Sequence, residues 1–212
     1  MARQQHDLME TVVASGVVNQ KLIEAFRTIP RADFVPEQSR SIAYEDRPIP
    51  IAHNQVTTQP SLSAMMIEAL DPGPESRVLE VGTGLGFQSA LLAYLAGEVV
   101  SIEVWEDLAE RAASNLARQR ITNVDIHVGD GSLGVPDRAP YDGILVSAAF
   151  TEVPGPLFDQ LVDGGRIVQP IGPGGRETVT LFARAGDDLN RIREIIPARF
   201  VRLVGREAFD DG

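Results

Sequence analysis

The chain has 212 residues, 43% of them hydrophobic and 23% charged, which is ordinary for a globular protein long enough to bury a core. Its formal net charge is −11 with no cluster of Lys and Arg, which argues against duplex nucleic acid or an anionic membrane as a partner. It has no cysteine, and its three histidines lack metal-ligand spacing, so thiol chemistry is excluded and no metal is expected.

The first 76 residues predict helices separated by a proline-rich segment. Residues 1–30 predict two helices, the second beginning after Asn19 and ending at Pro30. Residues 30–60 contain five prolines and predict an extended segment that wraps over a core. A third helix follows, with Pro60 in its first turn, and DPGPES (71–76) predicts a turn.

From Arg77 onward the pattern alternates between apolar strands and amphipathic helices. The expected strands are RVLEVG, EVVSIEV, DIHVGD, YDGILVSA, GGRIVQPIG and TVTLFAR, with ARFVRLVG as a candidate last strand. This alternation predicts an α/β fold with a doubly wound, mostly parallel sheet of the Rossmann type. We expect one domain over residues 1–212, with an N-terminal helical and loop region (1–74), a cofactor-binding core (75–185) and a C-terminal strand region (186–212).

The segment LEVGTGLGFQ (79–88) is the strongest local signal. A buried strand leads into three glycines and then a helix, which is the arrangement that lets a ligand approach the main chain. The spacing is G-x-G-x-G, whereas the dinucleotide fingerprint is G-x-G-x-x-G. A glycine-rich turn alone is weak evidence of binding.

Three carboxylates sharpen the interpretation. Glu103 ends the next strand, at the distance typical of a ribose ligand, and Asp130 follows the strand after that, where it could accept a hydrogen bond from an adenine amino group. Glu80 stands before the glycines, where it would repel a pyrophosphate but tolerate a sulfonium and an amino group. The combination favours S-adenosylmethionine over NAD. The alternatives are a solvated strand end at Glu103 and a turn cap at Asp130.

The segment from Pro48 to Ile67 is neutral apart from His53, in a strongly acidic chain. A carboxylate nucleophile is already ionised at neutral pH, so it needs neutral donors and no competing acid. Thr57, Thr58 and Gln55 can donate, and a helix N-terminus near Pro60 favours an anion. The alternative is a loop that merely caps this helix.

These residues resemble the protein-L-isoaspartate O-methyltransferase family. The likeness runs from about Val13 to Gly205 and is carried by IPRADFVP (29–36), AYEDRPIPI (43–51), QVTTQP (55–60), VLEVGTGLGFQSALLA (78–93), VGDGSLG (128–134), APYDGILVSAA (139–149), LVDGGRIVQPIG (161–172) and RFVRLVG (199–205). AYEDRPIPI with the downstream QP is not a general methyltransferase feature, so the likeness is specific.

The resemblance implies an enzyme that methylates the α-carboxyl of L-isoaspartyl residues in damaged proteins with S-adenosylmethionine, after which the ester closes to a succinimide. The implied cofactor contacts are Glu80, Gly82, Thr83, Gly84, Glu103, Asp130 and Gly131. The implied substrate contacts are Ala52, His53, Gln55, Val56, Thr57 and Ala148, with residues 199–205 on the other side. Isoaspartyl peptides are the expected partners of a cytoplasmic monomer.

The chain departs from the family at two positions. Thr58 stands where the family has its active-site Ser, which keeps the hydroxyl but adds a methyl group and stiffens χ1. Arg202 stands where a Pro is customary. Two other functions therefore stay open: a carboxyl methyltransferase with another peptide or small-molecule substrate, and a non-catalytic cofactor-binding module.

Overall fold

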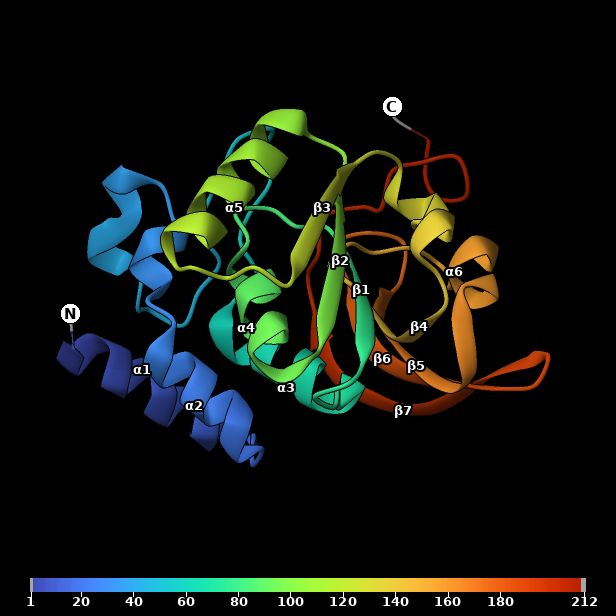
Figure 1. Ribbon diagram of the computed structural model, residues 1–212, viewed down its shortest axis with the longest axis horizontal. Coiled ribbons are helices and arrows are strands. Elements are labelled where there is room, and N and C mark those ends of the chain that lie inside the picture. The colour runs from blue at the N-terminus through green and yellow to red at the C-terminus, as the bar shows by residue number, and fades with distance from the viewer. Residues whose placement is uncertain (1, 211–212) are drawn as a thin grey trace.

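The computed structural model describes residues 2–210, and its centre is one seven-stranded sheet (Figure 1). The strand order is β3-β2-β1-β4-β5-β6-β7, with the first five strands parallel and β6 and β7 antiparallel to their neighbours. The strands are β1 Arg77–Val81, β2 Glu98–Glu103, β3 Val124–Val128, β4 Tyr141–Val146, β5 Leu161–Ile171, β6 Glu177–Ala185 and β7 Asp188–Ala198. The predicted doubly wound, Rossmann-like sheet is confirmed.

Helices cover both faces of this sheet. The α-helices are α1 Ala2–Ala14, α2 Gln20–Thr28, α3 Pro60–Leu70, α4 Phe87–Leu95, α5 Glu106–Arg118 and α6 Gly155–Asp159. The 3-10 helices are η1 Arg31–Phe34, η2 Glu37–Ile42, η3 Gly131–Leu133 and η4 Pro136–Arg138. In Figure 1, α3, α4 and α5 lie on one side of the sheet with α1 and α2 outside them, and α6 lies on the other side.

Neighbouring residues of each central strand face opposite layers. Val78 of β1 packs with the helices of the α3–α4 side, whereas Leu79 belongs to the cluster on the α6 side. Leu145 and Ile144 of β4 divide in the same way. Both faces are therefore buried, which is why these strands read as continuous apolar runs.

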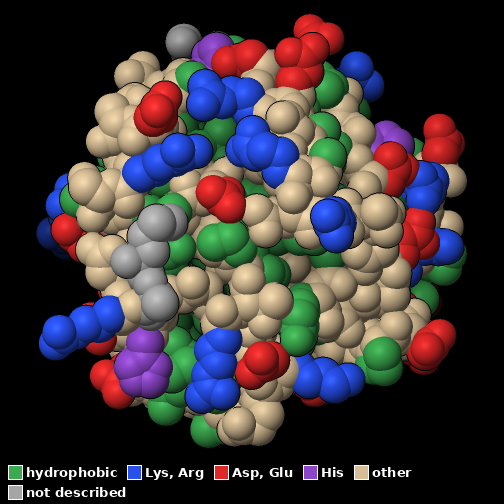
Figure 2. All heavy atoms as spheres, turned by 60° about the vertical axis from the view of Figure 1, so that its left-hand side comes forward, with side chains coloured by type: hydrophobic (Ala, Val, Ile, Leu, Met, Phe, Trp, Pro, Cys, Tyr) green, Lys and Arg blue, Asp and Glu red, His purple; other side chains and the backbone are tan. Residues whose placement is uncertain are grey.

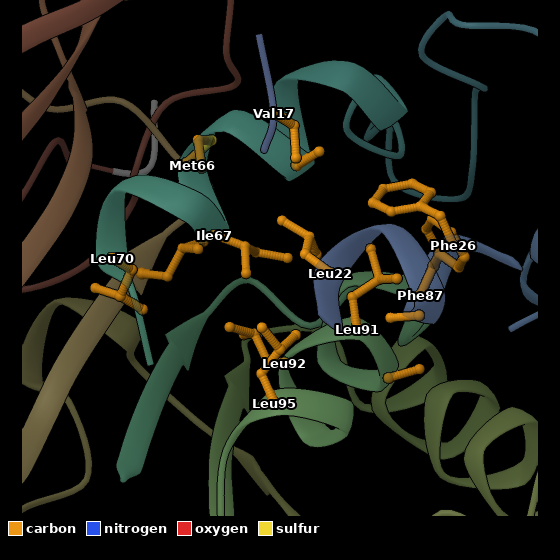
Figure 3. Close-up of a cluster of buried hydrophobic side chains, with 14 of the residues drawn as sticks. Val17, Leu22, Phe26, Met66, Ile67, Leu70, Phe87, Leu91, Leu92 and Leu95 are labelled. Atoms are coloured by element: carbon orange, nitrogen blue, oxygen red, sulfur yellow. The ribbon is translucent and has the colours of Figure 1, made fainter. Parts of the chain in front are cut away.

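The packing of α2, α3 and α4 holds the site in place. Leu22, Ile67 and Leu91 come from these three helices, are fully buried and point toward one another (Figure 3). The loop that precedes α3 and the glycine turn that precedes α4 both line the cavity described below. Fixing the two helices against each other therefore fixes the two segments that form the site.

Two expectations about local structure were wrong. The segment after Pro30 is not extended throughout: η1 and η2 each begin directly after a proline, at Pro30 and Pro36. The last strand is β7, Asp188–Ala198, while residues 199–205 form only isolated bridges. The sequence of β7 concealed it, because most of this edge strand is exposed and carries charged residues without a two-residue alternation.

Charges of both signs are scattered over the face that carries α1 and α2, and no large area of one sign stands out there (Figure 2). Among the helices of residues 2–210, none combines the length and the hydropathy that crossing a membrane would require.

Asn123 connects the start of β3 to the end of α4 by hydrogen bonds. It lies at the amino ends of the parallel strands, whereas the glycine turn lies at their carboxyl ends. Its side-chain amide donates to the carbonyl oxygens of Ala93 (2.9 Å), Ala96 (3.2 Å) and Gly97 (3.4 Å). We expect Asn123→Ala to lower the free energy of unfolding by about 1–2 kcal/mol, because these carbonyls lose a shared donor.

Urea unfolding measures this change, with Thr122→Ala at the exposed neighbouring position as the control. An Asn123→Ala variant as stable as the control would contradict the assigned role.

Candidate active site

A cavity of about 520 Å³ opens beyond the carboxyl ends of β1, β2 and β4, where ligands bind in open parallel sheets. Its walls come mainly from the segment before α3, the glycine turn, the end of β2, the residues after β4 and the tail after β7, with single residues from η1 and η3. The lining residues used below are His53, Gln55, Val56, Thr57, Thr58, Gly82, Thr83, Gly84, Gln88, Glu103, Trp105, Gly131, Ser147, Ala148, Val201 and Arg202.

The glycine turn between β1 and α4 needs its glycines. The φ angle is 94° at Gly82 and 87° at Gly86, a region that other residues rarely adopt. A Cβ at Gly86 would also lie 3.2 Å from the Cβ of Ala112 on α5. The turn therefore brings main-chain atoms of Gly82, Thr83 and Gly84 to the cavity wall, as the sequence predicted for a ligand-binding loop.

Glu103 closes β2 and holds the glycine turn by a hydrogen bond. Its carboxylate accepts from the backbone N–H of Gly84 at 2.8 Å and of Trp105 at 3.2 Å. The side chain is 6% exposed and lines the cavity. It is the only carboxylate among the lining residues, and each oxygen keeps a lone pair with which it can accept from a ligand hydroxyl.

Glu80 lies beneath the turn and does not line the cavity. It is fully buried and accepts hydrogen bonds from the hydroxyls of Ser89 and Ser101 and from the Gln88 amide at 3.2 Å. Burial raises the pKa of Glu80 to about 7, against the opposing effect of these three donors. The predicted direct cofactor contact is absent from this arrangement, in which Glu80 supports the turn from below.

Two lining residues were missed by the sequence reasoning. The Gln88 amide bridges the Glu80 carboxylate and the Ser147 hydroxyl, the latter at 2.7 Å. Because Glu80 and Ser147 both receive from the Gln88 nitrogen, the Gln88 oxygen is left without a protein partner within residues 2–210. Gln88 and Ser147 line the cavity and connect it to the buried carboxylate. They are far apart in sequence, and neither forms part of a motif that could have revealed the contact.

Asp130 caps η3 and does not line the cavity, whereas Gly131 does. Its carboxylate accepts from the N–H of Ser132 at 2.9 Å and of Arg206 at 2.7 Å. Burial would raise the pKa of Asp130, but these hydrogen bonds outweigh it and hold that pKa below its usual value. The bond to Arg206 joins the C-terminal tail (red in Figure 1) to the segment after β3. The turn-cap alternative therefore describes Asp130 in this conformation.

Residues 51–56 form a tight hairpin. The N–H of Gln55 donates to the carbonyl of Ala52 at 3.1 Å, and Pro50 and Val56 are bridged across the hairpin. His53 and Asn54 at its tip have φ angles of 57° and 55°, which is the pairing of a type I′ turn. Ala52 is exposed and lies outside the cavity lining, in contrast to the other substrate residues expected in this segment.

The hairpin tip is attached to the loop after β2. The His53 ring stacks on Trp105 with the ring centres 4.0 Å apart and the planes parallel. His53 also lies 2.7 Å from the carboxylate of Asp107. Trp105 thus supports the hairpin while lining the cavity.

A second cavity, of about 260 Å³, adjoins the first. The residues common to the two linings are Val56, Thr57, Thr58, Ser147 and Val201. The lining of the second cavity contains no carboxylate, and Arg199 is its one charged residue. Thr58 therefore lies where the two cavities meet, next to the first turn of α3, which begins at Pro60. No group of three or more potential metal ligands occurs among the residues that the structure describes.

A family model described as "Protein-L-isoaspartate(D-aspartate) O-methyltransferase (PCMT)" matches residues 3–208. The protein-L-isoaspartate O-methyltransferase of Methanoculleus marisnigri is 46% identical over 96% of this chain and 93% of that protein. The protein of the same name from Roseiflexus sp. is 40% identical over 98% of this chain and 95% of that protein.

Solved structures are similar as well. One protein-L-isoaspartate O-methyltransferase superposes with a TM-score of 0.84 at 31% identity, covering 96% of this chain and 67% of the other. A Plasmodium falciparum protein solved in complex with S-adenosyl-L-homocysteine has a TM-score of 0.77 at 21% identity, covering 94% and 98% of the two chains. The second comparison supports the fold alone.

Glu80 gives a prediction about stability and pH. Its pKa is raised from 4.5 to about 7 by burial, so the folded protein binds this proton more tightly than the unfolded chain does. The resulting stabilisation is present below pH 4.5 and is lost as the pH rises through 7. A glutamine has no such proton, so Glu80→Gln should gain about 2 kcal/mol relative to the wild type between pH 5 and pH 8.

Urea unfolding at the two pH values tests this, with the exposed Glu24→Gln as a control that should follow the wild type. If the Glu80→Gln and wild-type stabilities change in parallel with pH, the buried carboxyl does not titrate as stated.

Proposed function

The chain belongs to the protein-L-isoaspartate(D-aspartate) O-methyltransferase family, and from that premise we propose how its two cavities share the reaction. The protein is an S-adenosylmethionine-dependent methyltransferase that esterifies the α-carboxyl group of L-isoaspartyl residues in damaged proteins. The larger cavity holds the cofactor, the smaller one admits the isoaspartyl segment, and Thr58 orients the reacting carboxylate between them. The single observation that carries this division is that Thr58 lines both cavities.

The residues of the larger cavity fit the cofactor in charge and in shape. When bound, S-adenosylmethionine supplies an electrophilic methyl group on a positively charged sulfur. Glu103 would accept the ribose hydroxyls, and the main chain of Gly82, Thr83 and Gly84 would hold the methionine part. Gly131 would contact the adenine, while Asp130 holds the segment behind it. Support comes from the lining, which offers one carboxylate and no basic group near the glycine turn.

In this arrangement Glu80 acts on the cofactor through another residue and does not contact it. The sequence suggested a direct contact with the amino group of the cofactor, but the carboxylate lies beneath the turn. We assign the electrostatic link between Glu80 and the cavity to Gln88, because its amide donates a hydrogen bond to the Glu80 carboxylate and also lines the cavity. A positively charged ligand above this wall would favour the ionised form of Glu80.

The substrate is a carboxylate, and this determines what the site must supply. Its pKa is about 4, so it arrives ionised and no base has to remove a proton. Thr58 can donate its hydroxyl hydrogen to one carboxylate oxygen, which leaves the other oxygen to attack the methyl group. The nearby N-terminus of α3 favours the negative charge, and no carboxylate lines the smaller cavity to repel it.

The walls around Thr58 would hold the rest of the peptide. We assign substrate contacts to Val56 and Thr57, which line both cavities, and to His53, Gln55 and Ala148 on the wall of the larger one, which the substrate would reach from the smaller cavity. Ala52 contributes only through the backbone of the hairpin turn, because its carbonyl accepts from Gln55. Once formed, the methyl ester closes to a succinimide: the main-chain nitrogen of the next residue attacks the ester carbonyl and methanol leaves, whereas an anionic carboxylate is too poor an electrophile for this attack.

Thr58 and Arg202 favour a second candidate, a carboxyl methyltransferase retuned to another peptide or small molecule. Arg202 lines the larger cavity and lies 5.0 Å from the Phe209 ring, with no carboxylate ion pair among residues 2–210. A cation at this mouth suits an acidic substrate. Monomeric state and cytoplasmic location stay predictions, as does the lack of a nucleic acid partner, which the net charge of −11 supports.

The substrate assignment is tested with labelled S-adenosylmethionine and two peptides that differ only in an isoaspartyl or aspartyl linkage. We expect label to be transferred to the isoaspartyl peptide at a rate at least about tenfold higher, because its free α-carboxyl is attached directly to Cα, whereas an aspartyl carboxylate stands one methylene further from the main chain. Equal labelling of both peptides would support the retuned methyltransferase. Cofactor binding without labelling of either peptide would support a non-catalytic module.

The role of the Thr58 hydroxyl is tested by two substitutions of known shape. Thr58→Ser keeps the donor and should retain or raise kcat on the isoaspartyl peptide. Thr58→Val keeps the shape but removes the donor, and should lower kcat by a factor on the order of 10². Steady-state kinetics measures both, and a valine variant with unchanged turnover would show that the hydroxyl is not used.

A further inference from the structure

Arg31 is a buried cation that binds the carbonyl oxygens of the loop formed by residues 43–47. Its side chain is 1% exposed and lies at the start of η1. Its guanidinium donates to the carbonyls of Ala43 (2.7 Å), Glu45 (3.0 Å) and Arg47 (3.1 Å). Burial lowers the pKa of Arg31 to about 10, a value at which it remains charged at neutral pH. One side chain thus holds the whole 43–47 loop.

The same guanidinium reaches the segment that precedes α3. It donates to the Thr57 hydroxyl oxygen at 3.1 Å, and that oxygen also accepts from the N–H of Ile49 at 3.1 Å. The N–H of Thr57 in turn donates to the carbonyl of Ile49 at 2.8 Å. The position of Thr57 is therefore determined by three hydrogen bonds, one of which comes from Arg31.

Asp46, within the loop that Arg31 holds, fastens the other side of Thr58. One carboxylate oxygen accepts from the N–H of Ser61 at 2.8 Å. The other accepts from the Ser61 hydroxyl and from the Gln59 amide, both at 2.8 Å. Asp46 therefore caps the first turn of α3 and restrains Gln59. Its negative charge also compensates the buried positive charge of Arg31.

Thr58 lies between these two attachments. Thr57 before it is bonded to Arg31, and Gln59 after it is bonded to Asp46. Arg31 lines neither cavity, so it does not touch cofactor or substrate in this arrangement. Thr58 lines both. Arg31 can therefore act on turnover only through its neighbours, which are Thr57, the 43–47 loop and the Phe87 ring, whose centre lies 5.9 Å from the guanidinium and which lines the larger cavity.

We propose that Arg31 is a positioning residue for methyl transfer, which holds the Thr58 hydroxyl at the junction of the two cavities through Thr57 and through the loop that carries Asp46. The proposal rests on the proposed role of Thr58. A small displacement of an orienting group lowers turnover strongly, because transfer requires close alignment of the attacking oxygen with the methyl group. The glycine turn of the cofactor cavity is held separately by Glu103, but Phe87 and Thr57, which Arg31 contacts, also line this cavity, so cofactor binding is measured beside turnover.

The test combines Arg31→Lys with a matched pair at Thr57. Lysine keeps the charge but lacks the planar fork that serves the loop and Thr57 together. Thr57→Val keeps the shape and removes the hydroxyl, and Thr57→Ser keeps the hydroxyl. We expect Arg31→Lys and Thr57→Val to lower kcat on the isoaspartyl peptide at least tenfold, and Thr57→Ser, which keeps the acceptor for Arg31, to lose less kcat than Thr57→Val.

Two further readouts separate positioning from general loosening. Calorimetric binding of S-adenosyl-L-homocysteine should stay within about twofold of the wild type in Arg31→Lys, because Arg31 does not line the cofactor cavity and its glycine turn is held by Glu103. The double variant Arg31→Lys/Thr57→Val should be no slower than the slower single variant, because both changes break the same connection. Asn123→Ala serves as the control: it is destabilised at the opposite end of the parallel strands and should keep its kcat.

Wild-type kcat in the folded Arg31→Lys and Thr57→Val proteins would overturn the proposal while leaving the function intact. A loss of affinity for S-adenosyl-L-homocysteine that matches the loss of kcat would also overturn it. So would a double variant whose loss of kcat is the product of the two single losses. If Arg31→Lys does not fold, the Thr57 pair decides: equal kcat in the serine and valine variants counts against positioning. Absent turnover in the wild type would overturn the proposed function itself.

Discussion

Two carboxylates on neighbouring strands hold the glycine turn, and the rest of the site depends on this. Glu80 lies beneath the turn, bonded to Ser89 of α4 and Ser101 of β2, and Glu103 accepts from the N–H of Gly84 above it. The turn is thereby attached to its own helix and to the adjacent strand. A glycine-rich segment has large conformational entropy, so these attachments are what give it one shape against which a ligand can bind.

The reaction adds a different constraint. A carboxylate nucleophile needs no proton removed, so the site has to supply alignment and a suitable electrostatic environment in place of a base. The neutral segment before α3 meets this need: it lines both cavities and contains no acid. The charged groups that hold it, Arg31 and Asp46, lie behind it and outside both linings. Charge is thus used to fix the backbone while the reacting surface stays neutral.

The sequence predicted the features that depend on local patterns. The parallel strands, the glycine turn and the carboxylate at Glu103 follow from apolar runs and from spacing, and the structure agrees with each. Features that depend on distant contacts were missed. Gln88 meets Ser147 across 59 positions of sequence, and only the fold brings them together. Glu80 and Asp130 were expected at the cavity wall, but neighbouring hydroxyl and amide donors hold both carboxylates behind it. Strand β7 was missed because an exposed edge strand needs no apolar alternation.

The stacked His53 and Trp105 rings at the hairpin tip also give the protein an intrinsic fluorescent probe of the hairpin's position. The chain has a single tryptophan, and it is Trp105, in parallel contact with an imidazole at 4.0 Å. Indole emission, excited at a wavelength that tyrosine does not absorb, therefore originates from one place, and separation of the two rings changes the surroundings of the only indole. Movement of the hairpin away from the cavity can be followed by intrinsic fluorescence in real time, without attaching a dye to the protein.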